Sequence, residues 1–245
     1  MQKTLVALAL TLLLAPLFAA SPDKKKTRDE TKIVDAGSFG IFQAGRRIAT
    51  ETFRIQQTAT QSLTTSEIKT EGAEPMVQSF ELTMAANGDL MKYLWREDKP
   101  ERLQSSLEAG DQILMQHIIM GEEKEKNKNK DIPYILPSST SVLDDYFFVH
   151  REVLTWRYLA TECPALTDCK LKKVNIGVIV PRQHTSGLVT MEFAGRDKVV
   201  LKGMQTELNH FVLHADDVDW SLYFDDAQKM VKVEVPSEKT EVVRD

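Results

Sequence analysis

The chain has 245 residues, a mass of 27.7 kDa and a mean hydropathy of −0.29, with 42% hydrophobic and 27% charged residues. This composition excludes collagen-like, polytopic membrane and wholly disordered proteins. The formal net charge is −5, and no long basic stripe interrupts the sequence. Nucleic acid, whose phosphates require a concentration of basic side chains, is therefore not an expected partner.

The first twenty residues have the form of a secretory signal peptide. Lys3 supplies the positive charge of a short first region, and residues 5–18 form an uncharged, leucine-rich run. As a helix this run would be roughly 21 Å long, which is shorter than the roughly 30 Å hydrocarbon core of a bilayer. We expect cleavage after Ala19 or after Ala20, with an uncleaved anchor as the alternative. No later segment is apolar for long enough to span a membrane, so the mature protein is expected to be exported and soluble, in the periplasm or outside the cell.

The rest of the chain divides into two parts by composition. Residues 21–36 are charged and contain few apolar side chains, which predicts a disordered leader. Residues 37–245 are expected to form a single β-rich domain with a helix at about 141–160.

Export also bears on the two cysteines, Cys163 and Cys169. In an oxidising compartment two thiols this close in sequence are more often paired than catalytic, so we predict a disulfide between them. Their spacing differs from the two-residue spacing of a redox turn, and two thiols without nearby histidines make a poor zinc site. No metal and no cofactor are expected.

Alternation of apolar and polar residues predicts strands along most of the domain. The clearest run is 76–84, in which Met76, Phe80, Leu82 and Met84 share one face. Asn87-Gly88 then predicts a tight hairpin turn. Further strands are predicted at 40–42, 48–56, 90–96, 102–109, 112–120, 174–180, 188–194, 198–201, 204–214, 218–225 and 230–235, and the polar run at 122–131 is expected to be a loop. Strands at this spacing favour an antiparallel sheet over βαβ units.

One helix is predicted, at residues 141–160. Ser141 can cap it, and Asp144 and Asp145 lie in its first turn, where the helix dipole favours anions. Apolar side chains occupy two adjoining rows, so the helix must be covered over much of its circumference. The expected fold is therefore mainly β (α+β), with a strongly curved antiparallel sheet or barrel wrapped around one central helix.

Motifs that carry catalysis or bind cofactors are absent from the sequence. His150, Arg151 and Glu152 are interpreted as the water-exposed edge of the helix. On a strand, His210 and His214 would lie about 13 Å apart, which is too far to share a metal ion.

Two stretches resemble a group of exported bacterial proteins known only as domains of unknown function. The first is GIFQAGRRIA at residues 40–49, followed by Glu51, and the second comprises residues 220–225, 230–236 and 241–244. Ala49 stands where many members of that group carry a second glycine. The resemblance implies a barrel-like antiparallel sheet in the cell envelope, similar to the half-barrels that carry lipids or lipoproteins in the periplasm, and it implies no catalytic residue.

A curved sheet that its own side chains do not fill presents a concave apolar surface, which can bind an apolar molecule. The leading hypothesis is therefore a non-enzymatic exported protein that binds or carries an apolar ligand such as a lipid acyl chain. The alternatives are a structural or assembly factor of the envelope that acts through protein contacts and, least favoured, a hydrolase with dispersed Asp and His residues. The expected lining comprises large residues on inward faces, which could equally be ordinary core: Phe80, Leu82, Met84, Tyr93, Trp95, Trp220 and Phe224.

Overall fold

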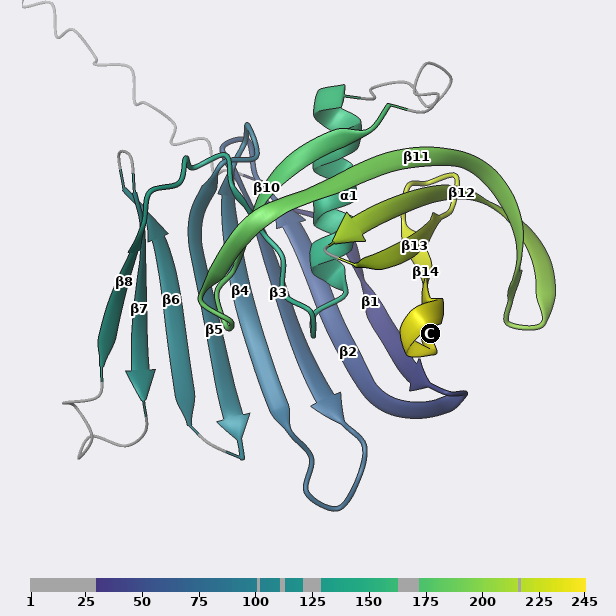
Figure 1. Cartoon of the computed structure of the whole chain (residues 1–245), viewed down its shortest axis with the longest axis horizontal. Coiled ribbons are helices and arrows are strands. Elements are labelled where there is room, and N and C mark those ends of the chain that lie inside the picture. The colour runs from purple at the N-terminus through teal and green to yellow at the C-terminus, as the bar shows by residue number, and fades with distance from the viewer. Residues whose placement is uncertain (1–29, 101, 111–112, 121–128, 163–171, 216) are drawn as a thin grey trace, which may run out of the picture.

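The computed structural model in Figure 1 describes residues 30–100, 102–110, 113–120, 129–162, 172–215 and 217–245. The predicted signal peptide and the predicted Cys163–Cys169 disulfide lie outside these residues. The described chain forms a 15-stranded sheet and the α-helix α1 (Val149–Glu162). Among the described residues, the structure contains no helix with the length and apolar character needed to cross a membrane.

The first half of the chain forms an antiparallel meander, which we call the first wing. Each strand pairs with the next one along the chain. The strands are β1 (Lys32–Gln43), β2 (Arg46–Gln57), β3 (Gln61–Thr70), β4 (Val77–Ala85), β5 (Leu90–Lys99), β6 (Leu103–Ala109), β7 (Leu114–Met120) and β8 (Lys130–Tyr134).

The last part of the chain forms a second meander, the second wing, and β1 pairs with β15 to join the two wings into one sheet. The short strand β9 (Ser141–Val142) pairs in parallel with β10, whereas the other neighbours in the sheet are antiparallel. The strands of the second wing are β10 (Val174–Val180), β11 (Thr185–Leu201), β12 (Met204–Ala215), β13 (Val218–Phe224), β14 (Met230–Val235) and β15 (Thr240–Arg244).

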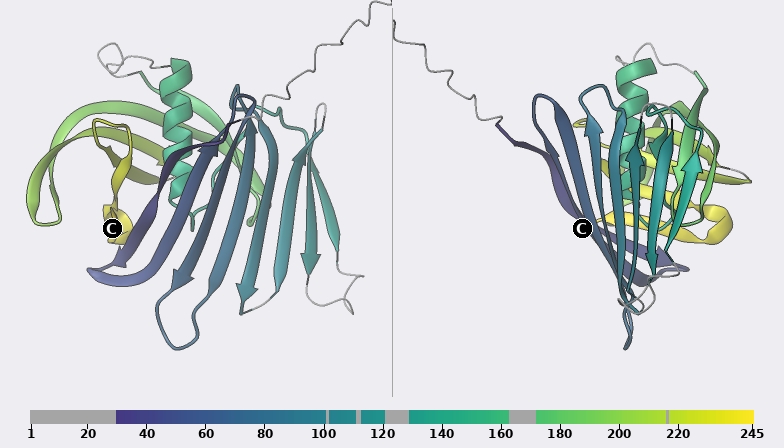
Figure 2. Two further views of the ribbon diagram at one scale, coloured as in Figure 1. Left: turned by 180° about the vertical axis from the view of Figure 1, so that it is seen from behind. Right: turned by 90° about the vertical axis from the view of Figure 1, so that its left-hand side faces the viewer.

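The helix stands between the two wings, and the second wing curls over it (Figure 2). Phe147, just before α1, packs edge-on against Phe80 of the first wing, with ring centroids 4.8 Å apart. Tyr158 on α1 packs against Phe211 of the second wing at 6.2 Å. The expected curved antiparallel sheet around a central helix is therefore confirmed. The sheet remains open, because the edge strands β8 and β9 do not pair with each other.

The turn between β10 and β11 brings the second wing against the inner face of the first. Gln116 on β7 donates hydrogen bonds from Nε2 to the Pro181 carbonyl oxygen at 2.6 Å and to Ser105 Oγ at 2.7 Å. Arg182 in the same turn forms an ion pair with Asp144 and donates to Gln78 Oε1 on β4 at 3.0 Å. Side chains in this turn thus connect the wings where strand pairing does not.

Several boundaries differ from those expected from the sequence. Strand β1 begins at Lys32, so residues 32–36 are part of the sheet rather than of a leader, because they pair with the end of β2. The helix begins at Val149 and not at Ser141, which lies in β9. Strands β3, β8 and β15 were not expected, and the runs at 188–194 and 198–201 belong to one long bulged strand, β11.

The expected water-exposed edge of the helix is also wrong. Its three residues, His150, Arg151 and Glu152, are all buried. His150 packs against Phe80 and Tyr93 of the first wing, whereas Arg151 and Glu152 contact Trp220 and Met230 of the second wing. Burial lowers the pKa of His150 well below its usual range, and the positive charges of Arg151 and Arg182 add to the shift. His150 is therefore neutral, and its Nδ1 accepts a hydrogen bond from the Asp144 N–H at 3.1 Å.

An ion-pair cluster secures the seam between the wings. Arg244 on β15 binds Asp35 on β1 through two hydrogen bonds of 2.9 and 2.7 Å, and Lys229 lies 3.2 Å from Asp35 Oδ1. Burial by itself would raise the pKa of Asp35, but hydrogen bonds from Arg244 and Glu152 hold it below its ordinary value. Burial raises the pKa of Glu152 well above its usual range, and the proximity of Asp35 adds to this rise. The pKa values of these two neighbouring carboxyl groups are thus shifted in opposite directions.

We predict that Arg244→Met lowers the free energy of unfolding by about 3 kcal/mol, because it leaves the Asp35 carboxylate largely buried without its main partner. Urea denaturation followed by circular dichroism measures the change. Arg54→Met, which alters an exposed arginine on β2, is the matched control and should be close to neutral. Equal decreases in the free energy of unfolding in the two variants would contradict a stabilising role for the Arg244–Asp35 ion pair.

Candidate functional site

A cavity of about 540 Å³ lies between β1–β3, the β12–β13 hairpin and the segment that leads into α1. We call it the Trp220 cavity. Its rim includes the carboxylates of Asp145 and Glu238. Most of its lining residues are aliphatic or aromatic, and they include Ile41, Ile48, Ala49, Ile68, Phe148, Ala215, Val218 and Trp220. Gln43, Thr70 and Thr240 add polar side chains to the lining. An apolar concavity of this size with a few polar groups at the mouth is the usual form of a small-molecule binding site.

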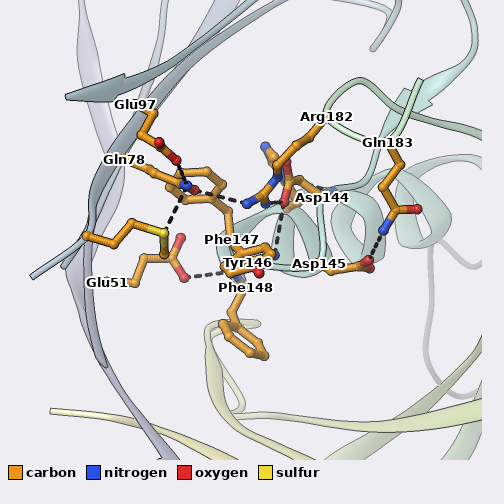
Figure 3. A network of polar contacts seen from close by, with 12 residues as sticks. Glu51, Gln78, Glu97, Asp144, Asp145, Tyr146, Phe147, Phe148, Arg182 and Gln183 are labelled. Carbon is orange, nitrogen blue, oxygen red and sulfur yellow. Dashed lines mark hydrogen bonds and ion pairs between the residues drawn. The ribbon is translucent and has the colours of Figure 1, made fainter. Parts of the chain in front are cut away.

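The wall formed by Phe148 depends on Glu51, a fully buried carboxylate on β2. Glu51 Oε2 accepts a hydrogen bond from the Phe148 N–H at 2.7 Å, and Oε1 accepts one from the Val149 N–H at 3.3 Å (Figure 3). These N–H groups belong to the start of α1, where no intrahelical acceptor exists for them. A carboxylate from the sheet therefore caps the helix and determines where it begins.

Ser66 on β3 completes this contact by donating its hydroxyl to Glu51 Oε1 at 2.8 Å. Burial raises the pKa of Glu51 to about 7, although these hydrogen bonds and the charge of Arg151 act in the opposite direction. The carboxyl group therefore changes its charge near neutral pH, at the wall of the cavity.

Arg151 lies behind the aromatic wall. Its guanidinium carbon is 3.8 Å from the centroid of the Trp220 ring and 5.2 Å from that of Phe148. Its Nη1 donates to the carbonyl oxygens of Asp144 at 3.1 Å and Phe147 at 3.3 Å. Arg151 therefore holds both rings and the segment before α1 in place through cation–π contacts and hydrogen bonds.

Asp144 fixes the beginning of that segment. Its Oδ1 accepts a hydrogen bond from the Tyr146 N–H at 3.0 Å and pairs with Arg182, which also contacts Gln78 (Figure 3). The Arg182 guanidinium stacks over the Tyr146 ring at 3.7 Å. The segment from Asp144 to Phe148 is thus held by both wings, so the cavity it borders is largely preformed.

The seven residues expected to line a binding site do not border one common cavity, although Phe80 pairs with Trp95 and Leu82 with Tyr93 across β4 and β5. Trp220 lines the Trp220 cavity, whereas Trp95 lines a separate cavity described below. Phe80 and Tyr93 pack around His150, and Phe224 packs against Phe211 at 5.3 Å. Leu82 and Met84 border only a crevice of about 10 Å³, which is too small to hold a ligand.

Sequence reasoning missed Glu51, Ile68 and Phe148 as parts of the site. A signal for Glu51 was present, because it shares the inward parity of Ala49, Phe53 and Ile55 on β2 and is the charged member of that row. A charged side chain at an inward position requires a partner in the interior. The partner itself, a helix start almost a hundred residues later, could not be identified from local sequence.

The histidines offer no metal centre. His214 contacts Glu192 at 3.0 Å and Asp219 at 2.6 Å, whereas His210 contacts Asp197 at 2.7 Å and stacks on Tyr223. Within the described part of the chain, no three His, Cys, Asp or Glu side chains are grouped so that they could hold a metal ion.

We predict that Glu51 makes the stability of the protein depend on pH. The pKa of Glu51 is about 7 in the folded chain and 4.5 by its ordinary value, so its favourable contribution is complete at low pH and is lost as the pH rises through 7. The free energy of unfolding of the wild type, relative to that of Glu51→Gln, should therefore fall by about 3 kcal/mol over this range. Urea denaturation at a series of pH values measures the difference.

The control for this prediction is Glu67→Gln, which alters an exposed carboxylate on the neighbouring strand β3. It should show little change in the same comparison. If the difference in free energy of unfolding between wild type and Glu51→Gln stayed constant from pH 4.5 to about pH 8, this would contradict the titration assigned to Glu51.

Comparisons with known proteins give a structural likeness. No protein-family model matches the chain, and no curated protein sequence matches it. Among solved structures, it is similar to a β-barrel-like protein of a domain of unknown function, DUF1849, from Brucella abortus. The likeness covers 85% of this chain and 93% of that protein, with 9% sequence identity and a TM-score of 0.49.

Proposed function

We propose that this chain is an exported cell-envelope protein, not an enzyme, that binds or carries an apolar ligand such as a lipid acyl chain in the Trp220 cavity. The observation that carries the proposal is the cavity itself. Its volume of about 540 Å³ lies within the range of small-molecule sites, and its walls are mainly apolar. Export is proposed from the uncharged run at residues 5–18 that follows Lys3.

The contacts around the cavity support binding of a guest rather than simple packing. Phe148 and Trp220 are held from behind by Arg151, and the chain before α1 is held by Asp144 and Arg182. Walls fixed in this way lose little conformational freedom when an apolar molecule enters, which lowers the cost of binding.

The rim restricts the part of the ligand that remains in water. Glu238 and Asp145 place two carboxylates at the mouth. Asp145 lies 3.8 Å from Arg151 Nη2 and accepts a hydrogen bond from Gln183, so Glu238 contributes most to the repulsion of an anionic head group. The chain or ring that occupies the cavity is therefore expected to belong to a neutral or cationic molecule.

We predict that filling the cavity abolishes this binding. Ala215 is half-buried in its wall, so Ala215→Trp places an indole ring in the space that a ligand would occupy. The probe is N-phenyl-1-naphthylamine, an uncharged apolar dye whose fluorescence rises on binding. Ala215→Trp should weaken its affinity at least about tenfold, equivalent to 1.4 kcal/mol.

The matched control is Ala109→Trp, which alters a half-buried alanine on β6, outside the Trp220 cavity. It should bind the dye like the wild type. Urea denaturation of both variants separates lost binding from lost folding. A folded Ala215→Trp that binds the dye with unchanged affinity would contradict the proposal, as would a wild type that does not bind it.

A further inference from the structure

A second cavity, of about 260 Å³, lies where the β10–β11 turn meets the first wing. We call it the Lys130 cavity. It shares no lining residue with the Trp220 cavity. It has an apolar body, formed by residues such as Trp95 and Ile118, and a basic mouth.

The floor of the Lys130 cavity is one row of the sheet. Trp95 pairs with Ser105, Ser105 with Ile118, and Ile118 with Lys130, on four successive strands from β5 to β8. Residues in register on neighbouring strands point to the same face of the sheet. The backbone pairing therefore fixes the order of the row, from an aromatic ring at β5 to a charged amine at β8.

The roof is the β10–β11 turn, which contributes Pro181, Arg182 and His184. Gln116 holds the Pro181 carbonyl, and Asp144 and Gln78 hold Arg182. The Arg182 guanidinium also lies 5.6 Å from the centroid of the Trp95 ring, and so spans roof and floor. Floor and roof are thus both positioned before any ligand arrives.

The charged side chains that line the cavity have one sign. They are Lys130 and Arg182, and none of its described lining residues is acidic. Arg182 is already paired with Asp144, so the exposed Lys130 is the cation with the greatest freedom to meet a ligand. Asp131, the next residue, has the opposite parity on β8 and contacts His117 at 2.8 Å, away from the cavity.

We propose that the Lys130 cavity binds a small monoanion with an apolar body, such as a medium-chain carboxylate. The apolar part would lie along Trp95, Leu103 and Ile118, and the anionic group would face Lys130. The limited volume excludes a whole lipid, and the basic mouth gives this cavity the opposite charge preference to the Trp220 cavity, whose rim is acidic. This inference goes beyond the proposed function, because it concerns another site and another class of ligand.

The test compares three probes of equal chain length that differ in charge: octanoate, octan-1-ol and octylammonium. Isothermal titration calorimetry uses the full chain carrying Ala215→Trp, whose Trp220 cavity is filled and cannot take the neutral or cationic probe. It should show binding of octanoate at one site, with at least about tenfold weaker binding of the alcohol and the amine. Lys130→Gln should weaken octanoate binding about three- to tenfold, the effect of one charge-assisted contact. Lys130→Arg should retain most of the affinity.

Controls separate this site from the Trp220 cavity. Lys69→Gln alters an exposed lysine on β3 outside the Lys130 cavity and should leave octanoate binding unchanged. Leu103→Trp fills the Lys130 cavity and should abolish octanoate binding while sparing N-phenyl-1-naphthylamine, and Ala215→Trp should have the reverse effect. Equal affinity of Ala215→Trp for octanoate and octan-1-ol, or octanoate binding that Ala215→Trp abolishes and Leu103→Trp spares, would overturn the proposal.

Discussion

The structure depends on one contact, the buried carboxylate of Glu51 against the unpaired N–H groups at the start of α1. A helix enclosed by a curved sheet cannot satisfy its first N–H groups with water, so the sheet must supply an acceptor. Glu51 supplies this acceptor from β2, and the Ser66 hydroxyl on β3 donates a hydrogen bond to the buried Glu51 carboxylate. The contact sets the end of the helix, the position of Phe148 and one wall of the Trp220 cavity.

The same constraint explains why the interior of a β-rich domain contains so many ionisable groups. Asp35, Glu152 and Arg244 meet at the seam of the wings, and Asp144 and Arg182 meet where the second wing closes on the first. The first cluster lies beside the paired strands β1 and β15, and the second lies where the wings meet without strand pairing. Unpaired burial of any of these charges would be costly, so their partners make the arrangement specific.

Curvature leaves space on both sides of the segment before α1, and the two spaces differ in charge. The Trp220 cavity opens beside Asp145 and Glu238, whereas the Lys130 cavity opens beside Lys130, Arg182 and His184. Both are bordered by positions whose backbone is fixed by sheet register or by buried ion pairs. The proposed binding of apolar molecules rests on the apolar walls of the two cavities, and the proposed selectivity for ligand charge rests on the charged residues at their mouths.

The local sequence pattern was enough to predict most strands, the Asn87-Gly88 turn, and a helix within an antiparallel sheet. Apolar and polar side chains alternate along half-buried strands, and hairpin turns need residues that tolerate positive φ. The pattern failed at β3, whose inward residues include Thr64 and Ser66, because these polar side chains hide the alternation. Ser66 is polar because it donates a hydrogen bond to Glu51. The pattern also placed the helix start at Ser141, since no local signal reveals a cap donated by β2. Which inward residues border a sizeable cavity, and which only fill the core, was decided by tertiary structure alone: Trp220 and Leu82 both lie on inward faces of strands, but Trp220 lines the Trp220 cavity whereas Leu82 borders only a small crevice.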